Sequence, residues 1–239
     1  MKKRMLFCLT FAVAATLLSA QSNCFIGLHG GITQSRFYSP DGLNYANERE
    51  IFIRPNFGIS LRHDFKEKFY WQANLQYQQF GEQVLLINDL RWPSEQDGNG
   101  GYTPDPNLPH RLEYYQKTDY VSFRAGVGYY LWRSEKFRLG VMPFAAADFF
   151  IKNKEEQRFV YDDGHFDSEP GTEYYGNGEF RKVNPAAGLA LSFQAKLSPN
   201  LDVFLSPDAT IQLMPTTTGI DDTHRYHALG LNAGIFYRL

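Results

Sequence analysis

Residues 229–239 read LGLNAGIFYRL, with an apolar side chain at every second position from Leu229 to Leu239. Because successive side chains of a β-strand point to opposite faces, this period predicts a strand with one apolar face. The last residues of a water-soluble domain usually fray, whereas a closed barrel pairs its last strand with its first. We therefore expect this stretch to close a β-barrel.

The same alternation recurs along the chain and is cleanest in residues 69–78, FYWQANLQYQ. Short turns at 65–68, 133–136 and 198–200 alternate with longer polar segments at 38–50, 86–110, 153–180 and 215–223. An even strand number with short turns at one end and long loops at the other is typical of barrels that cross a membrane. The sequence thus predicts an all-β, closed antiparallel transmembrane β-barrel of about eight strands with up-and-down topology.

Four prolines fall inside predicted strands, where the missing N–H interrupts the hydrogen-bond ladder. We expect bulges or shifted strand boundaries at these positions, which are Pro55, Pro143, Pro185 and Pro207.

The composition is typical of a barrel whose outer face contacts lipid and whose interior is polar. The 239 residues are 43% hydrophobic and 16% aromatic, yet the mean hydropathy is only −0.41, as expected when one strand face contacts lipid and the other a polar lumen. A net charge of −2 gives no case for nucleic-acid binding. A lipocalin-like barrel, apolar inside, also alternates. It does not explain why charges gather on one strand face while the other is rich in aromatics.

The first 22 residues resemble an export signal, with a basic start at Lys2–Arg4, an apolar stretch from Met5 to Leu18 and small residues before the predicted cleavage after Ser22. Residues 23–239 then form the barrel domain. Lipidation at Cys24 is the alternative, but Ser22-Asn23 makes a poor lipobox. No later apolar run approaches the 18 or more residues of a membrane helix. We expect an exported protein in the outer membrane of a Gram-negative bacterium.

An eight-stranded barrel is just wide enough for its interior to be filled by side chains. We predict that charged residues on the inward face form a hydrogen-bonded, ion-paired plug; the alternative is a narrow path for ions or small solutes. The residues predicted to form this polar network are Arg62, Arg124, Arg138, Asp148 and Asp208.

The sequence gives only weak indications of a metal site or a catalytic site. The acidic segment 153–180 could offer oxygen ligands to Ca²⁺, but residues 161–165, YDDGH, lack the twelve-residue spacing of an EF-hand. His224 and His227 are three residues apart, which on a strand places them on opposite faces. No G-x-S-x-G element is present. We therefore expect neither an enzyme nor a bound cofactor or metal.

Several stretches resemble the PorT-like outer-membrane β-barrel family: GLHGGI at 27–32, PNFGI at 55–59, QFG at 79–81, RAGVGYY at 124–130 and the closing strand. The resemblance covers essentially all of residues 23–239. It implies an eight-stranded outer-membrane barrel, and some members are implicated in the export of surface proteins. It implies no catalytic residues.

We therefore expect a non-catalytic scaffold or accessory subunit of an envelope or protein-export assembly, which contacts a partner through loops 86–110 and 153–180. The alternative is a narrow, porin-like channel. Besides membrane lipid, we expect the outer-membrane assembly machinery as a partner during insertion. The predicted assembly signal is the apolar face of the last strand, formed by Leu231, Ala233, Ile235, Tyr237 and Leu239.

Overall fold

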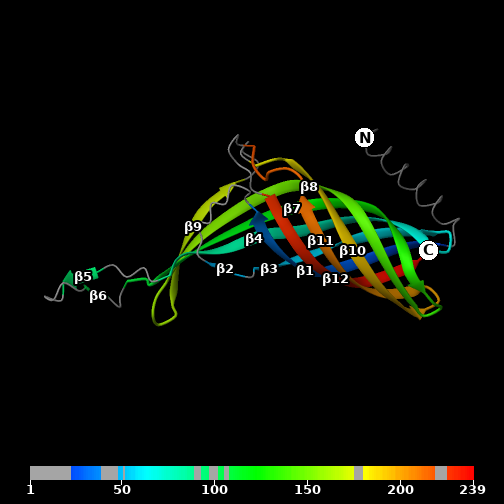
Figure 1. Cartoon of the computed structure of the whole chain (residues 1–239), viewed down its shortest axis with the longest axis horizontal. Coiled ribbons are helices and arrows are strands. Elements are labelled where there is room, and N and C mark those ends of the chain that lie inside the picture. Colours follow the sequence, from blue (N-terminus) through cyan, green and yellow to red (C-terminus); the bar gives the residue numbers. More distant parts are fainter. Residues whose placement is uncertain are drawn as a thin grey trace, which may run out of the picture.

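Eight antiparallel strands form a closed ring in the computed structural model, which describes residues 23–38, 48–50, 52–88, 93–96, 102–104, 108–174, 180–218 and 225–239. The predicted signal peptide lies outside the described residues. Each barrel strand pairs with the next one along the chain, and the last pairs with the first (Figure 1). The strands are β1 (Cys24–Tyr38), β3 (Ile53–Phe65), β4 (Phe69–Asn88), β7 (Arg111–Arg133), β8 (Phe137–Val160), β10 (Val183–Ser198), β11 (Leu201–Gln212) and β12 (Arg225–Arg238).

The closing seam is continuous. Strand β12 pairs with β1 from Phe25↔Arg238 to Tyr38↔Arg225 without a register shift, and the Leu239 N–H donates to the Cys24 carbonyl at 2.9 Å. The ring therefore has no exposed edge. The closing strand begins at Arg225, four residues before the predicted start at Leu229. The difference arises because residues 225–228, which lack the apolar alternation, also pair with β1. None of the described residues belongs to a helix long and apolar enough to span a membrane.

The two faces of the ring differ sharply in polarity. Outward side chains are apolar and exposed, such as Leu28 (59%), Leu229 (63%) and Tyr237 (52%). Inward side chains include buried charged and amide groups. A large exposed apolar surface marks contact with another apolar phase. The five residues predicted as the assembly signal are all exposed: four lie on the outer face of β12, and Leu239 directly follows it.

Three barrel strands continue beyond the ring, where two further strands join the same sheet. Strands β7 and β8 contain 23 and 24 residues, about twice the 12 of β11. Beyond the ring, β8 pairs with β9 (Phe166–Tyr174), and β4 pairs with β2 (Glu48–Glu50). We call the part of β4, β7 and β8 beyond the ring, together with β2 and β9, the extension sheet. Figure 1 places β9 at the end of the molecule opposite the C-terminus.

The structure corrects three predicted loops, the first of which, at 38–50, contains β2. The segment predicted as a loop from Asn153 to Phe180 instead contains the end of β8 and all of β9. The segment predicted as a loop from Leu86 to His110 contains the end of β4 and a small hairpin of β5 (Pro93–Gln96) and β6 (Tyr102–Pro104). The error has a physical reason. Beyond the ring no strand face meets lipid, so the sequence there loses its apolar alternation.

The four in-strand prolines lie where the ladder is interrupted on one side. Pro143 and Pro207 pair with Leu189 and Leu231 on one side and fall in gaps of the register on the other. Pro55 pairs with β1 and lies one residue before the first β3–β4 pair. Pro185 pairs with β8 and lies one residue before the first β10–β11 pair. A residue without an N–H is tolerated at these positions because no neighbouring carbonyl requires it.

Candidate functional site

An arginine fills the bore near the short-turn end. Arg62 is fully buried and forms ion pairs with Asp64 at 3.3 Å and Asp202 at 3.4 Å. It also donates to the Gln194 side chain. Arg138 joins the same two carboxylates, at 3.5 Å from Asp64 and 3.3 Å from Asp202. Arg133 also lies 3.7 Å from Asp64. Three arginines therefore neutralise the two carboxylates, and such pairing is what burial of charge requires.

A second polar cluster lies farther along the bore. Arg124 forms an ion pair with Asp208 at 3.2 Å and donates to Gln78 at 2.7 Å. Asp148 accepts hydrogen bonds from Ser122 at 2.6 Å, from Gln78 at 3.0 Å and from Gln212 at 3.2 Å. These bonds link β4, β7, β8 and β11 across the interior.

The five residues predicted as one network thus form two clusters. Arg62 and Arg138 belong to the first, and Arg124, Asp148 and Asp208 to the second. Sequence reasoning missed Asp64, because it lies at the end of its strand beside the charged turn. The glutamines that connect the charges were also missed, since alternation fixes their face but not their partners.

Aromatic side chains pack inside the bore near both ends. Near the short turns, Phe25, Phe204 and Phe236 pack together, with the Phe204 and Phe236 ring centroids 4.7 Å apart. The guanidinium of Arg62 lies 4.2 Å from the Phe25 ring centroid. At the other end, a cluster of Phe80, Tyr120, Tyr226 and Ala228 closes the interior.

Between these clusters lies a cavity of about 30 Å³. That volume holds a water molecule or two and excludes larger solutes. His29 and Ser60 line it, with the Ser60 hydroxyl 2.9 Å from His29 Nδ1, and Asp208 lines the same cavity. These are the residue types of a hydrolytic triad, but the cavity has no room for a substrate. The pair was missed because its members lie on different strands.

Metal-binding geometry is not found within the described residues, where no group of three or more His, Cys, Asp or Glu side chains could hold an ion. His227 points outward from β12, and His224 lies outside the described residues. Among the acidic residues of segment 153–180, Asp162, Asp163 and Asp167 lie at or beside the β8–β9 turn. There Asp163 accepts hydrogen bonds from the backbone N–H and ring of His165, which lower the pKa of its carboxyl. Asp167 accepts a bond from the Tyr161 hydroxyl at 3.0 Å.

The extension sheet is held by side-chain pairs across its strands. Glu156 on β8 accepts hydrogen bonds from Arg158 at 2.7 Å and from Lys117 of β7 at 3.4 Å. The Arg158 guanidinium lies over the rings of Tyr115, at 4.3 Å from the centroid, and Phe166 of β9, at 4.9 Å. Burial raises the pKa of Glu156, but Arg158 and Lys117 outweigh it and hold that pKa below its ordinary value.

A further set of bonds anchors the extension sheet to the ring. The Thr118 hydroxyl donates to Asn153 at 2.8 Å and lies 2.9 Å from the Tyr226 hydroxyl of β12. All three side chains are buried. The base of the extension sheet is therefore bonded to the opposite wall of the bore, which orients it relative to the barrel.

A closed antiparallel ring with an apolar outer face and a polar, filled interior defines a small transmembrane β-barrel. The sequence matches no protein-family profile and no curated protein.

Solved structures similar to this chain include Ail, the attachment invasion locus protein of Yersinia pestis, in complex with the heparin analogue sucrose octasulfate (TM-score 0.40, 13% identity, 91% of this chain and 99% of that chain). Others are Neisserial surface protein A (0.38, 10%, 90% and 97%) and the outer membrane protein OprG from Pseudomonas aeruginosa (0.38, 11%, 92% and 97%). With similarities this low, we draw no argument about the site or the function from them.

Proposed function

We propose that this chain is an outer-membrane β-barrel that acts as a non-catalytic scaffold or accessory subunit of an envelope or protein-export assembly. The extension sheet is its contact surface for a protein partner. The observation that carries this proposal is the continuation of β4, β7 and β8 past the ring. The extra half of β8 corresponds to roughly 40 Å of strand at about 3.4 Å per residue, more than closure of a barrel requires.

The shape and bonding of the extension sheet support this role. A sheet anchored at its base by Thr118, Asn153 and Tyr226 presents its residues in a fixed arrangement, which lowers the entropy cost of binding. The acidic β8–β9 turn and the exposed Phe166 (53%) offer charge and an aromatic anchor at its far end. Aromatic anchors dominate many protein interfaces. The resemblance to PorT-like proteins adds protein export as the setting.

A channel is the competing function, and the filled bore argues against it. Ion pairs, side-chain hydrogen bonds and aromatic clusters near both ends occupy the interior, and the cavity between them measures about 30 Å³. Conduction would require buried, paired charges such as Arg62 and Asp202 to separate, which is costly in a medium of low dielectric constant.

The test is site-specific cross-linking in native membranes. A photo-reactive amino acid replaces Ser168, which is exposed on β9. The matched control places it at Lys136, exposed in a short turn at the other end of the barrel. We expect one discrete adduct with a single envelope protein from position 168 and not from position 136. Absence of an adduct at 168, or the same adducts from both positions, would overturn the proposal.

A further inference from the structure

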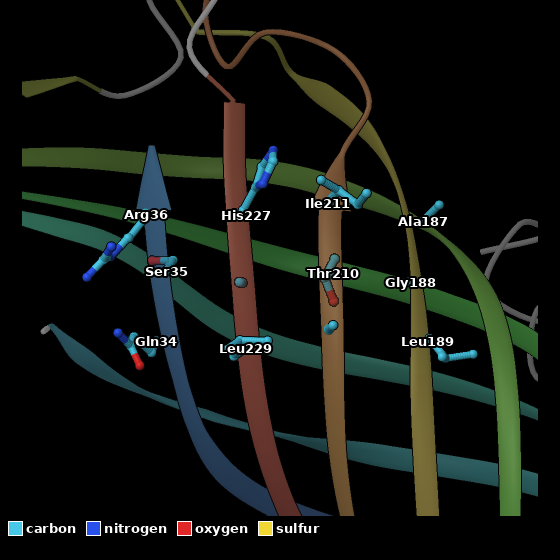
Figure 2. A pocket seen from close by; sticks show the side chains of 12 residues that line it. Gln34, Ser35, Arg36, Ala187, Gly188, Leu189, Thr210, Ile211, His227 and Leu229 are labelled. Carbon is cyan, nitrogen blue, oxygen red and sulfur yellow. The ribbon is translucent and has the colours of Figure 1, made fainter. Parts of the chain in front are cut away.

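The outer wall of the barrel contains a hollow of about 610 Å³ that spans β10, β11, β12 and β1 (Figure 2). The strand register explains it. Ala187 pairs with Ile211, and Leu189 pairs with Ala209, so small and large residues alternate diagonally on the lipid-facing surface. Ala209 then pairs with Leu229 of β12. The two alanines form the floor of the hollow, and the three larger side chains form its sides.

Arg36 and His227 line this hollow at the end nearer the long hairpins. Arg36 of β1 is exposed and pairs in register with His227 of β12, and Figure 2 shows both side chains above Gln34 and Leu229. Arg225 lies two residues before His227 and therefore faces the same side of the sheet. Below Arg36 the outward residue of β1 is first Gln34 and then apolar, at Ile32 and Leu28.

The change from apolar to cationic residues marks the level of the lipid headgroups. From Leu229 to Tyr237 the outward positions of β12 are all apolar. These eight steps rise roughly 20 Å along the membrane normal at about 3.4 Å per residue and ~40° tilt, close to the ~25 Å apolar band of such barrels. Arg36 thus lies at the membrane–water boundary, where an arginine can reach phosphate groups.

We propose that this hollow binds one phosphorylated membrane lipid from the leaflet on the extension side, with an acyl chain over Ala187 and Ala209 and the phosphate at Arg36. Lipid tails are as apolar as leucine, so a chain in the hollow gains little from its apolarity alone. Selectivity comes from the fit of the chain and from the phosphate charge. A second copy of the barrel is a poorer occupant, since a two-fold contact would bring the cations of both copies together.

The test measures lipid retention by the delipidated full chain in mild detergent, counted by native mass spectrometry. The probes are dioleoyl phosphatidic acid and dioleoyl phosphatidylcholine, which share acyl chains and differ in net charge. We expect one phosphatidic acid per barrel, with at least a fivefold preference. Arg36→Gln should lower the affinity for phosphatidic acid about fivefold, the equivalent of about 1 kcal/mol per cation. Ala209→Leu fills the hollow and should reduce retention of both lipids.

Two matched controls remove comparable groups elsewhere. Lys136→Gln deletes an exposed cation at the opposite end, and Ala125→Leu enlarges an exposed, lipid-facing alanine on β7; neither should change retention. Heat-dependent migration in gels verifies that each variant is folded. Equal retention of the two lipids would overturn the proposal, as would wild-type retention by Arg36→Gln or Ala209→Leu. Displacement of the lipid by inorganic phosphate would do the same, because it would leave no role for the acyl chain.

Discussion

Replacing Gly128 with alanine is expected to destabilise the barrel, because its Cβ would lie 2.1 Å from the ring Cζ of Tyr70. Tyr70 is buried, and its ring centroid lies 4.7 Å from that of Tyr130. On its other side, the Tyr70 hydroxyl already approaches Gly140 closely, at 3.0 Å from an added Cβ there. The ring cannot move away without disturbing the buried cluster that Tyr70 forms with Tyr130, Met142 and Phe144, so we expect the cost of overpacking, about 1–3 kcal/mol.

The matched control is Gly30→Ala on the lipid-facing side of β1. The nearest atom to its added Cβ is the Asn56 carbonyl oxygen at 3.7 Å, an ordinary contact. Since glycine loses more conformational entropy on folding than alanine, this change should be neutral or stabilising by up to about 1 kcal/mol. The same chemical substitution is therefore expected to change stability in opposite directions at the two positions.

Urea titrations in detergent micelles, followed by tryptophan fluorescence, measure both variants. A double-mutant cycle with Tyr70→Leu isolates the contact, because the shorter side chain leaves space for the new methyl group and should remove most of the Gly128→Ala penalty. The reasoning is refuted if Gly128→Ala unfolds at the urea concentration of the wild type. It is equally refuted if the penalty is unchanged in the Tyr70→Leu background.

Three further predictions concern the seam, the plug and the extension sheet. Deleting residues 237–239 removes the last pairs of the seam and should abolish stable insertion; wild-type amounts of heat-modifiable protein in membranes would contradict this. Arg62→Ala should lower the free energy of unfolding by about 3 kcal/mol, since Asp64 and Asp202 lose a buried partner, and a loss below about 1 kcal/mol in urea titrations would count against the plug. Glu156 has a lowered pKa in the folded protein, so its stabilising contribution is full above about pH 4.5 and is lost as the pH falls through the lowered value. Amide exchange in β8 and β9, corrected for intrinsic rates, should therefore accelerate at acidic pH in the wild type and lose that dependence in Glu156→Gln.

The ring of strands could be predicted from the sequence because lipid and lumen impose opposite polarities on alternate residues. The short turns around Glu67, Glu135 and Pro199 were predicted correctly, since each interrupts that alternation with charged or turn-forming residues. The inward faces of Arg62 and Arg124 followed from the same period. Their division between two clusters did not, because it depends on how far each residue lies along the bore and which strands face each other across it.

The extension sheet could not be predicted in the same way. Residues 152–158 read KNKEEQR, which in composition is a solvated loop. They form a strand because β7 and β9 supply backbone partners on both sides and because Glu156, Arg158 and Lys117 satisfy one another. Such pairing between distant segments leaves no periodic signal in a single sequence. The hollow on the outer wall was missed for a related reason, as it arises from the register of four strands.

Conductance in planar lipid bilayers tests most directly the claim that the bore is filled and that function lies outside it. The measurement uses the refolded full chain. Heat-dependent migration in gels verifies that the protein is folded. The structure predicts a current at the baseline of the bare bilayer, since aromatic clusters and two ion-paired clusters occupy the interior. A steady, stepwise conductance from the folded wild-type protein would contradict it and would make the barrel a channel.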